Sequence, residues 1–172
     1  SRRLAFAVSA ILAVISVVAV LPRQLALSRE LPAFTRPAEE VKVDLTKLPE
    51  KEVADKLGQL VQGDERVIVP GNYGFYLNYF SDIPQLRGAL FQSSIHPWPE
   101  HIYYQVTNGE DGDISLAWLK IANVGWLVYG GPRELFRDYK VPPEKFSEAG
   151  LELVDDIQGD RFFQVPLKDA SL

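Results

Sequence analysis

The amino-acid sequence predicts one transmembrane helix followed by a small α/β domain, with an α+β arrangement as the alternative. Three observations lead to this prediction. Residues 4–21 form an apolar run of 18 positions without a charged side chain. Helical and strand patterns follow one another from residue 46 onward, as they do in α/β units. Residues 151–166 then contain two short strand patterns joined by a turn, which predicts a C-terminal β-hairpin.

The apolar run has the length of a membrane span, because 18 residues at about 1.5 Å each make roughly 27 Å of helix. A cleavable signal peptide is the main alternative, but its apolar core is usually about 7–15 residues long. No clean small-x-small cleavage site follows the run. A helix buried in a soluble protein would need the rest of the chain to surround it. We therefore predict a transmembrane helix at 1–21, a connector at 22–45 and a domain at 46–172.

The distribution of charge separates the two ends of the chain. Residues 1–36 carry five basic side chains and one acidic one, and because the whole chain has a net charge of −5, residues 37–172 carry −9. An acidic domain without a basic run argues against nucleic acid as a partner. The absence of cysteine excludes disulfides and thiolate chemistry. Since the sequence also lacks methionine, we expect it to be a piece of a longer protein.

The sequence of the first part of the domain predicts a helix, a strand and a loop. Apolar residues recur at helical spacing from Thr46 to Gly63, and acidic residues occupy the first turn. Residues 66–70 are a short apolar strand that ends in proline. Residues 71–96, rich in Gly, Asn and Tyr, are predicted to be mostly loop. That loop follows the carboxyl end of the strand, where open α/β sheets tend to bind ligands.

The sequence of the second part of the domain predicts two more helices and a strand. A helix is expected from Pro97 to Val106, because proline is tolerated in a first turn. Asp113 is expected to cap a helix over residues 114–122. Residues 124–129 form a strand that is closed by glycine and proline.

Aromatic side chains are concentrated between Tyr73 and Tyr104. Such side chains stack on sugar rings, lie at membrane interfaces or fill a core. Arg87 can pair with an anionic group such as a lipid phosphate, with a structural salt bridge as the alternative. The candidate binding residues of this aromatic surface are Tyr73, Arg87, Trp98 and Tyr103.

Motifs for catalysis or for metal binding are not found. His96 and His101 are five positions apart with two prolines between them, which argues against shared metal ligation. We therefore predict no metal site and no cofactor. The sequence lacks a nucleophile elbow, a phosphate-binding loop and an EF-hand. A further alternative is an anchored hydrolase with two acidic residues, tested by Asp82 and Glu100.

Residues 66–167 resemble part of a known membrane-protein family. The features are the Arg66–Pro70 strand, the Tyr-rich sequence containing Ile83-Pro84 and Arg87-Gly88, the strand that begins at Asn123, and a terminal Gly-Asp-Arg-Phe-Phe. Their order resembles the extracytoplasmic region of polytopic proteins of the GT-C glycosyltransferase type. The most similar are YfhO-like proteins and membrane proteins with a 6-pyruvoyl-tetrahydropterin-synthase-related domain. Gly125 and Trp126 stand where that family usually has Lys and Tyr.

The resemblance implies that residues 4–21 are a late helix of a larger membrane core and that the domain lies outside the cytoplasm. Arginines flank the apolar run on both sides, so charge alone does not orient it. Such families resemble enzymes that transfer a sugar from a polyprenyl-phosphate carrier, and their catalytic acids lie in loops nearer the N-terminus of the full protein. No catalytic residue is therefore expected in this chain.

Two functions follow as expectations. The first is a non-catalytic extracytoplasmic domain of an integral cell-membrane protein of the glycosyltransferase type. The alternative is a single-pass, membrane-anchored module that binds a glycan or a protein. The expected partners are the lipid bilayer and a polyprenyl-linked sugar or glycan.

Overall fold

The computed structural model describes residues 44–88 and 96–167, together with the single positions 18, 20 and 22. The chain divides into two units at residues 43 and 44, and the second unit is described below. The predicted transmembrane segment, 4–21, lies outside the described residues except for positions 18 and 20. Among the residues that are described, none of the helices has the length and hydropathy needed to cross a bilayer.

The second unit is a small mixed α/β domain. Its elements in chain order are η1 (Leu45–Lys47), α2 (Pro49–Leu60), β1 (Arg66–Ile68), α3 (Gly71–Phe80), α4 (Trp98–Asn108), α5 (Gly112–Ile121), β2 (Val124–Tyr129), α6 (Glu144–Glu148), β3 (Glu152–Ile157) and β4 (Asp160–Gln164).

The four strands form one mixed sheet in the order β1-β2-β4-β3. β1 and β2 are parallel, and Val67 lies opposite Trp126. β4 is antiparallel to both of its neighbours, and β3 and β4 form the predicted C-terminal hairpin. Three helices of the described part of the chain lie between the two parallel strands in sequence, and parallel strands need a long crossover connection of this kind.

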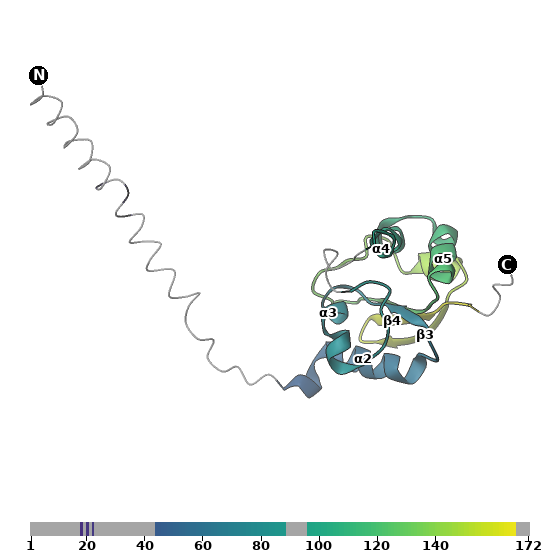
Figure 1. Cartoon of the computed structure of the whole chain (residues 1–172), viewed down its shortest axis with the longest axis horizontal. Coiled ribbons are helices and arrows are strands. Elements are labelled where there is room, and N and C mark those ends of the chain that lie inside the picture. The colour runs from purple at the N-terminus through teal and green to yellow at the C-terminus, as the bar shows by residue number, and fades with distance from the viewer. Residues whose placement is uncertain (1–17, 19, 21, 23–43, 89–95, 168–172) are drawn as a thin grey trace, which may run out of the picture. The chain divides into compact units, whose positions relative to one another are not determined.

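Helices cover both faces of the sheet, with α4 and α5 on one side and α2 on the other (Figure 1). Alternate residues of the inner strands enter different cores. Trp126 and Phe162 belong to the core that contains α2 and α3 residues, whereas Leu127 and Phe163 belong to the core of α4, α5 and α6. Because both faces are buried, β2 has a continuous apolar sequence rather than an alternating one.

The segment that begins at residue 71 was predicted to be mostly loop, and this prediction is wrong for α3. Glycine and asparagine at its start are poor helix formers, so the sequence pattern did not indicate a helix there. Tertiary contacts outweigh that propensity. Tyr73 and Leu77, one turn apart, are both 1% exposed and pack in the core with α2 residues. Gly74 permits close packing, since a Cβ there would lie 3.2 Å from the carbonyl oxygen of Val69.

The start of α5 also differs from the prediction. Asp111, rather than Asp113, is its N-cap, and its side chain accepts a hydrogen bond of 2.9 Å from the backbone N–H of Ile114. Both aspartates satisfy the sequence preference for a cap. The turn after α4 decides between them, because it leaves Asp111 extended and Gly112 as the first helical residue.

Candidate functional site

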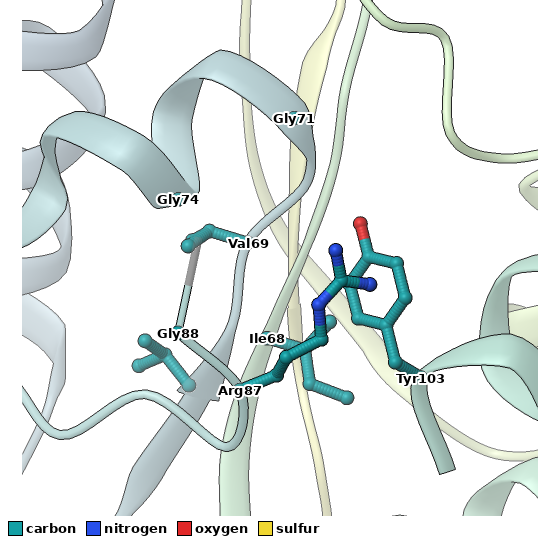
Figure 2. Close-up of a pocket in the computed structure, with 8 residues that line it drawn as sticks. Ile68, Val69, Gly71, Gly74, Arg87, Gly88 and Tyr103 are labelled. Carbon is teal, nitrogen blue, oxygen red and sulfur yellow. The ribbon is translucent and has the colours of Figure 1, made fainter. Parts of the chain in front are cut away.

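A small cavity lies at the carboxyl end of β1, between α3, α4 and the Arg87–Gly88 segment (Figure 2). Two candidate residues meet at this cavity: the guanidinium carbon of Arg87 lies 3.9 Å from the centre of the Tyr103 ring. The cavity volume is about 10 Å³, which accommodates roughly one water molecule. The cavity is therefore too small for a sugar or a phosphate-bearing ligand.

Arg87 is held by two contacts within the protein. Its guanidinium stacks on Tyr103, a cation–π contact. Its Nε lies 3.2 Å from Oε2 of Glu100, and the Arg87 side chain is 17% exposed. These contacts join the segment after β1 to α4. They give Arg87 a structural partner, which was the sequence-based alternative to an anionic ligand.

The N-terminus of α3 is occupied by the protein's own carboxylate. The backbone N–H of Gly71 donates a hydrogen bond of 2.9 Å to Oδ2 of Asp138, and the hydroxyl of Tyr103 donates to the same oxygen. Burial raises the pKa of the Tyr103 hydroxyl, and the neighbouring Tyr139 and Asp138 raise it further. Since a helix N-terminus attracts anions, Asp138 fills the position at which an anionic ligand of an α/β fold would bind.

Glu134 is a second buried carboxylate in the loop after β2. It is 2% exposed, and its oxygens accept hydrogen bonds from the backbone N–H groups of Phe136 (2.7 Å) and Asp138 (3.1 Å). Burial raises the pKa of Glu134, whereas these hydrogen bonds act in the opposite direction. Its oxygens therefore organise the loop of residues 134–138.

Asp160 is the centre of a third buried network. It has no exposed surface. The hydroxyl of Tyr73 donates to both of its oxygens at 2.9 Å, and the backbone N–H of Gly131 donates at 2.7 Å. Arg133 pairs with Asp160 and also with Glu52 of α2, where its Nη1 lies 2.6 Å from Oε2. The network connects the hairpin, α3, α2 and the loop after β2.

The largely apolar groove of the domain lies between α4 and α5 and has a volume of about 480 Å³. Trp98, at the start of α4, is 50% exposed. Its ring centre lies 5.3 Å from that of Trp118 on α5, with the planes tilted by 36°. His101 contacts both indoles edge-on, with centroid distances of 5.6 and 5.5 Å. This aromatic groove is lined by Arg66, Leu86, His96, Trp98, Pro99, Ile102, Trp118, Ile121 and Ala122.

The groove combines aromatic surface with a few polar groups at its rim. Arg66 is the single charged residue among the described residues that line it, and its Nη1 donates a hydrogen bond of 3.3 Å to the carbonyl oxygen of Ala122. His96 is exposed and accepts a hydrogen bond of 3.2 Å at Nδ1 from the backbone N–H of Trp98. Small-molecule sites commonly have this composition and a volume of about 300–1,000 Å³.

The four candidate residues therefore lie in three places. Arg87 and Tyr103 meet at the small cavity, Trp98 lies in the aromatic groove, and Tyr73 is buried in the core with α2. Trp98 is the exposed one of the four, since Tyr73 and Tyr103 are 1% and 7% exposed. Their role in ligand binding stays a prediction.

Sequence reasoning missed Trp118 as a partner of Trp98. The two residues are 20 positions apart, and only the packing of α4 on α5 brings them together. It also missed Asp138 and Glu134, which come from a loop whose sequence resembles an ordinary turn. The sequence feature that could have indicated the groove is Trp98, which lies in the first turn of α4.

Within residues 44–88 and 96–167, no three His, Cys, Asp or Glu side chains are grouped closely enough to hold a metal ion. His96 and His101 contact tryptophans instead. No protein-family model matches the chain, and neither a curated protein nor a solved structure matches it.

Proposed function

We propose that this chain is a membrane-tethered, non-catalytic binding module and that its ligand is a glycan bound in the aromatic groove. The single observation that carries this proposal is the pair formed by Trp98 and Trp118 in a groove of about 480 Å³. An exposed indole is costly to leave in water, and tryptophans next to polar groups are typical of binding surfaces.

A sugar ring suits the chemistry of this groove. One face of a pyranose presents C–H groups that pack on the exposed indole of Trp98, while its hydroxyl groups need donors and acceptors at the edge. Arg66 supplies donors there, and the imidazole of His96 supplies a further polar edge. The volume suits a monosaccharide or disaccharide in size.

The contacts of three carboxylates support a non-catalytic role. Asp160 and Glu134 are at most 2% exposed, and the half-buried Asp138 is bound by Gly71 and Tyr103. Each accepts hydrogen bonds that stabilise the fold. A general acid or base needs a proton-transfer path to a substrate, and these carboxylates face the protein's own groups. Glu100, one carboxylate of the hydrolase alternative, pairs with Arg87.

The binding experiment uses the full chain in lipid nanodiscs and a panel of glucose, galactose, mannose, N-acetylglucosamine and their β-linked disaccharides. Tryptophan fluorescence and calorimetric titration measure the dissociation constant. We expect saturable binding of at least one sugar. We also expect Trp98→Ala to weaken it by about tenfold, the loss that corresponds to one aromatic stacking contact.

Tyr104→Ala is the matched control, because Tyr104 lies on the same helix, is 63% exposed and does not line the groove. It is expected to bind like the wild type and to keep the wild-type Tm. Trp98→Ala also loses the contacts with Trp118 and His101, so circular dichroism should verify that it stays folded at the temperature of the titration. Equal binding by the wild type and Trp98→Ala would reject the groove as the site. If the wild type binds none of the sugars, a glycan is rejected as the ligand.

The resemblance to GT-C-type membrane proteins supports a more specific proposal, in which this module is part of a larger membrane protein. In that case residues 4–21 are one of several membrane helices, the domain lies outside the cytoplasm, and the glycan is a polyprenyl-linked sugar or its product. Sequencing the gene upstream of the codon for Ser1 tests whether the module belongs to such a protein. Further membrane helices are expected there, and their absence would leave the single-pass anchored module as the function.

A further inference from the structure

The outward face of α3 is apolar and aromatic. The ten residues of α3 include no charged side chain, whereas α2, which packs beside it, carries five. Phe75, Tyr76 and Tyr79 are 40%, 46% and 69% exposed. Their spacing places them on one side of the helix, opposite the buried Tyr73 and Leu77. A surface helix without charge indicates a contact surface.

The loop after β2 extends this surface. Leu135 and Phe136 are 76% and 58% exposed. The Phe136 ring stacks on Phe75, with centroids 5.7 Å apart and an interplanar angle of 28°. We call the five residues Phe75, Tyr76, Tyr79, Leu135 and Phe136 the α3 patch.

Two exposed basic residues follow the loop part of the α3 patch in the sequence. Arg137 and Lys140 are both exposed, and the Nζ of Lys140 donates to the carbonyl oxygen of Arg137 at 2.6 Å. No carboxylate of the described residues forms an ion pair with either cation. The neighbouring acids, Glu134 and Asp138, bind backbone N–H groups instead. This basic edge contrasts with a net charge of −9 over residues 37–172.

The chain enters the domain on the same helical layer. Asp44, the first residue of the domain, precedes η1 and α2, and α2 packs against α3. Residues 22–43 can span at most about 70–80 Å when extended. If residues 4–21 anchor the chain, a connector of this length keeps the domain within reach of the bilayer surface.

We propose that the α3 patch docks on the anionic lipid surface of the membrane to which residues 4–21 tether the chain. Tyrosine and phenylalanine suit the interface between headgroups and acyl chains. Arg137 and Lys140 match the negative charge of anionic headgroups. The proposal rests on the membrane tether of the proposed function and is independent of glycan binding.

Site-directed fluorescence on the full chain tests the docking. The sequence has no cysteine, so Leu135→Cys gives a single site for an environment-sensitive dye. Tyr104→Cys, on α4 and outside the patch, is the matched control. Each labelled chain is reconstituted in phosphatidylcholine vesicles with or without phosphatidylglycerol, and quenching by spin-labelled lipid is measured after flotation.

We expect lipid quenching at position 135 but not at position 104, and more of it in vesicles that contain phosphatidylglycerol. Arg137→Glu and Lys140→Glu should each weaken the docking equilibrium by about fivefold. Phe75→Ser combined with Tyr79→Ser should abolish quenching. All these substitutions are at exposed positions, so the Tm and sugar binding should stay at their wild-type values.

Three outcomes would overturn the proposal. A chain that fails to float with the vesicles lacks the membrane tether, and the docking falls with it. A chain that floats with position 135 unquenched keeps the tether but rejects the docking. Protection of position 135 from aqueous iodide in detergent micelles, together with a dimer by light scattering, would assign the α3 patch to a second copy of the chain.

Discussion

The guanidinium of Arg133 and the carboxylate of Asp160 form an ion pair in which Oδ2 of Asp160 lies 3.0 Å from Nε and 2.5 Å from Nη2. Asp160 is completely buried, and the Arg133 side chain is 20% exposed. The pair joins the first residue of β4 to the loop that follows β2. Because Tyr73 and Gly131 donate to the same carboxylate, several elements depend on one side chain.

Asp160→Ala is expected to lower the free energy of unfolding by about 3–5 kcal/mol, because it leaves Arg133 and the Tyr73 hydroxyl without their buried acceptor. Chemical denaturation followed by circular dichroism measures the change. Asp82→Asn is the control, since Asp82 is exposed, and its effect should stay within about 0.5 kcal/mol. Similar stabilities of the two variants would show that the Asp160 network contributes little.

Two glycine substitutions are expected to have opposite effects. Gly71 has a φ of +44°, and a Cβ there would overlap Oε1 of Glu134 and lie 2.9 Å from Cδ2 of Phe136. Gly71→Ala should therefore destabilise the domain by about 2 kcal/mol or more. Gly58, inside α2, has no atom within 4 Å of the added Cβ, so Gly58→Ala should stabilise it by about 0.5–1 kcal/mol. Thermal melts of both variants give the comparison, and equal shifts would contradict it.

Tyr103→Phe should lower the free energy of unfolding by about 1.5–3 kcal/mol, because the buried hydroxyl donates to the carboxylate of Asp138. The adjacent Tyr104 is 63% exposed, so Tyr104→Phe should change stability by less than about 0.5 kcal/mol. Urea denaturation of the pair measures the difference. If Tyr103→Phe were as stable as Tyr104→Phe, the hydrogen bond at the start of α3 would be dispensable.

Lys145 makes the stability depend on pH in the alkaline range. Its side chain is buried, and Nζ donates to the carbonyl oxygens of Val106 (3.0 Å) and Gly109 at the end of α4. Burial lowers the pKa of Lys145 from 10.5 to about 8. Between these two values the unfolded chain binds a proton that the folded chain has lost. The contribution of Lys145 to the free energy of unfolding therefore rises as the pH increases from about 8 to 10.5.

Lys145→Met removes this proton linkage. The free energy of unfolding of the wild type, minus that of Lys145→Met, should increase from pH 8 to pH 10.5. Urea denaturation at several pH values measures this difference. A difference that is flat or falls with pH would show that the folded state keeps Lys145 protonated.

Local sequence patterns predicted most of the elements. Residues 124–129 match β2, because six residues without a charge between turn residues have few alternatives to a buried strand. The C-terminal hairpin was confirmed for a similar reason, since Gln158 and Gly159 both adopt positive φ at the turn. The helix α3 was missed because its stability comes from Tyr73 and Leu77 packing in the core, and propensity carries no information about that contact.

The sequence by itself determined the apolar run at 4–21 as a candidate span, the acidic charge of the domain, the strand at 124–129 and the terminal hairpin. These are properties of neighbouring residues, so they can be recognised without a fold. The tertiary structure decided which side chains are free to bind. Tyr73 and Tyr103 are enclosed by residues from distant parts of the chain, whereas Trp98 meets Trp118 and stays exposed. Burial and partners arise from long-range contacts, and for that reason the aromatic groove and the α3 patch emerge only when the chain is folded.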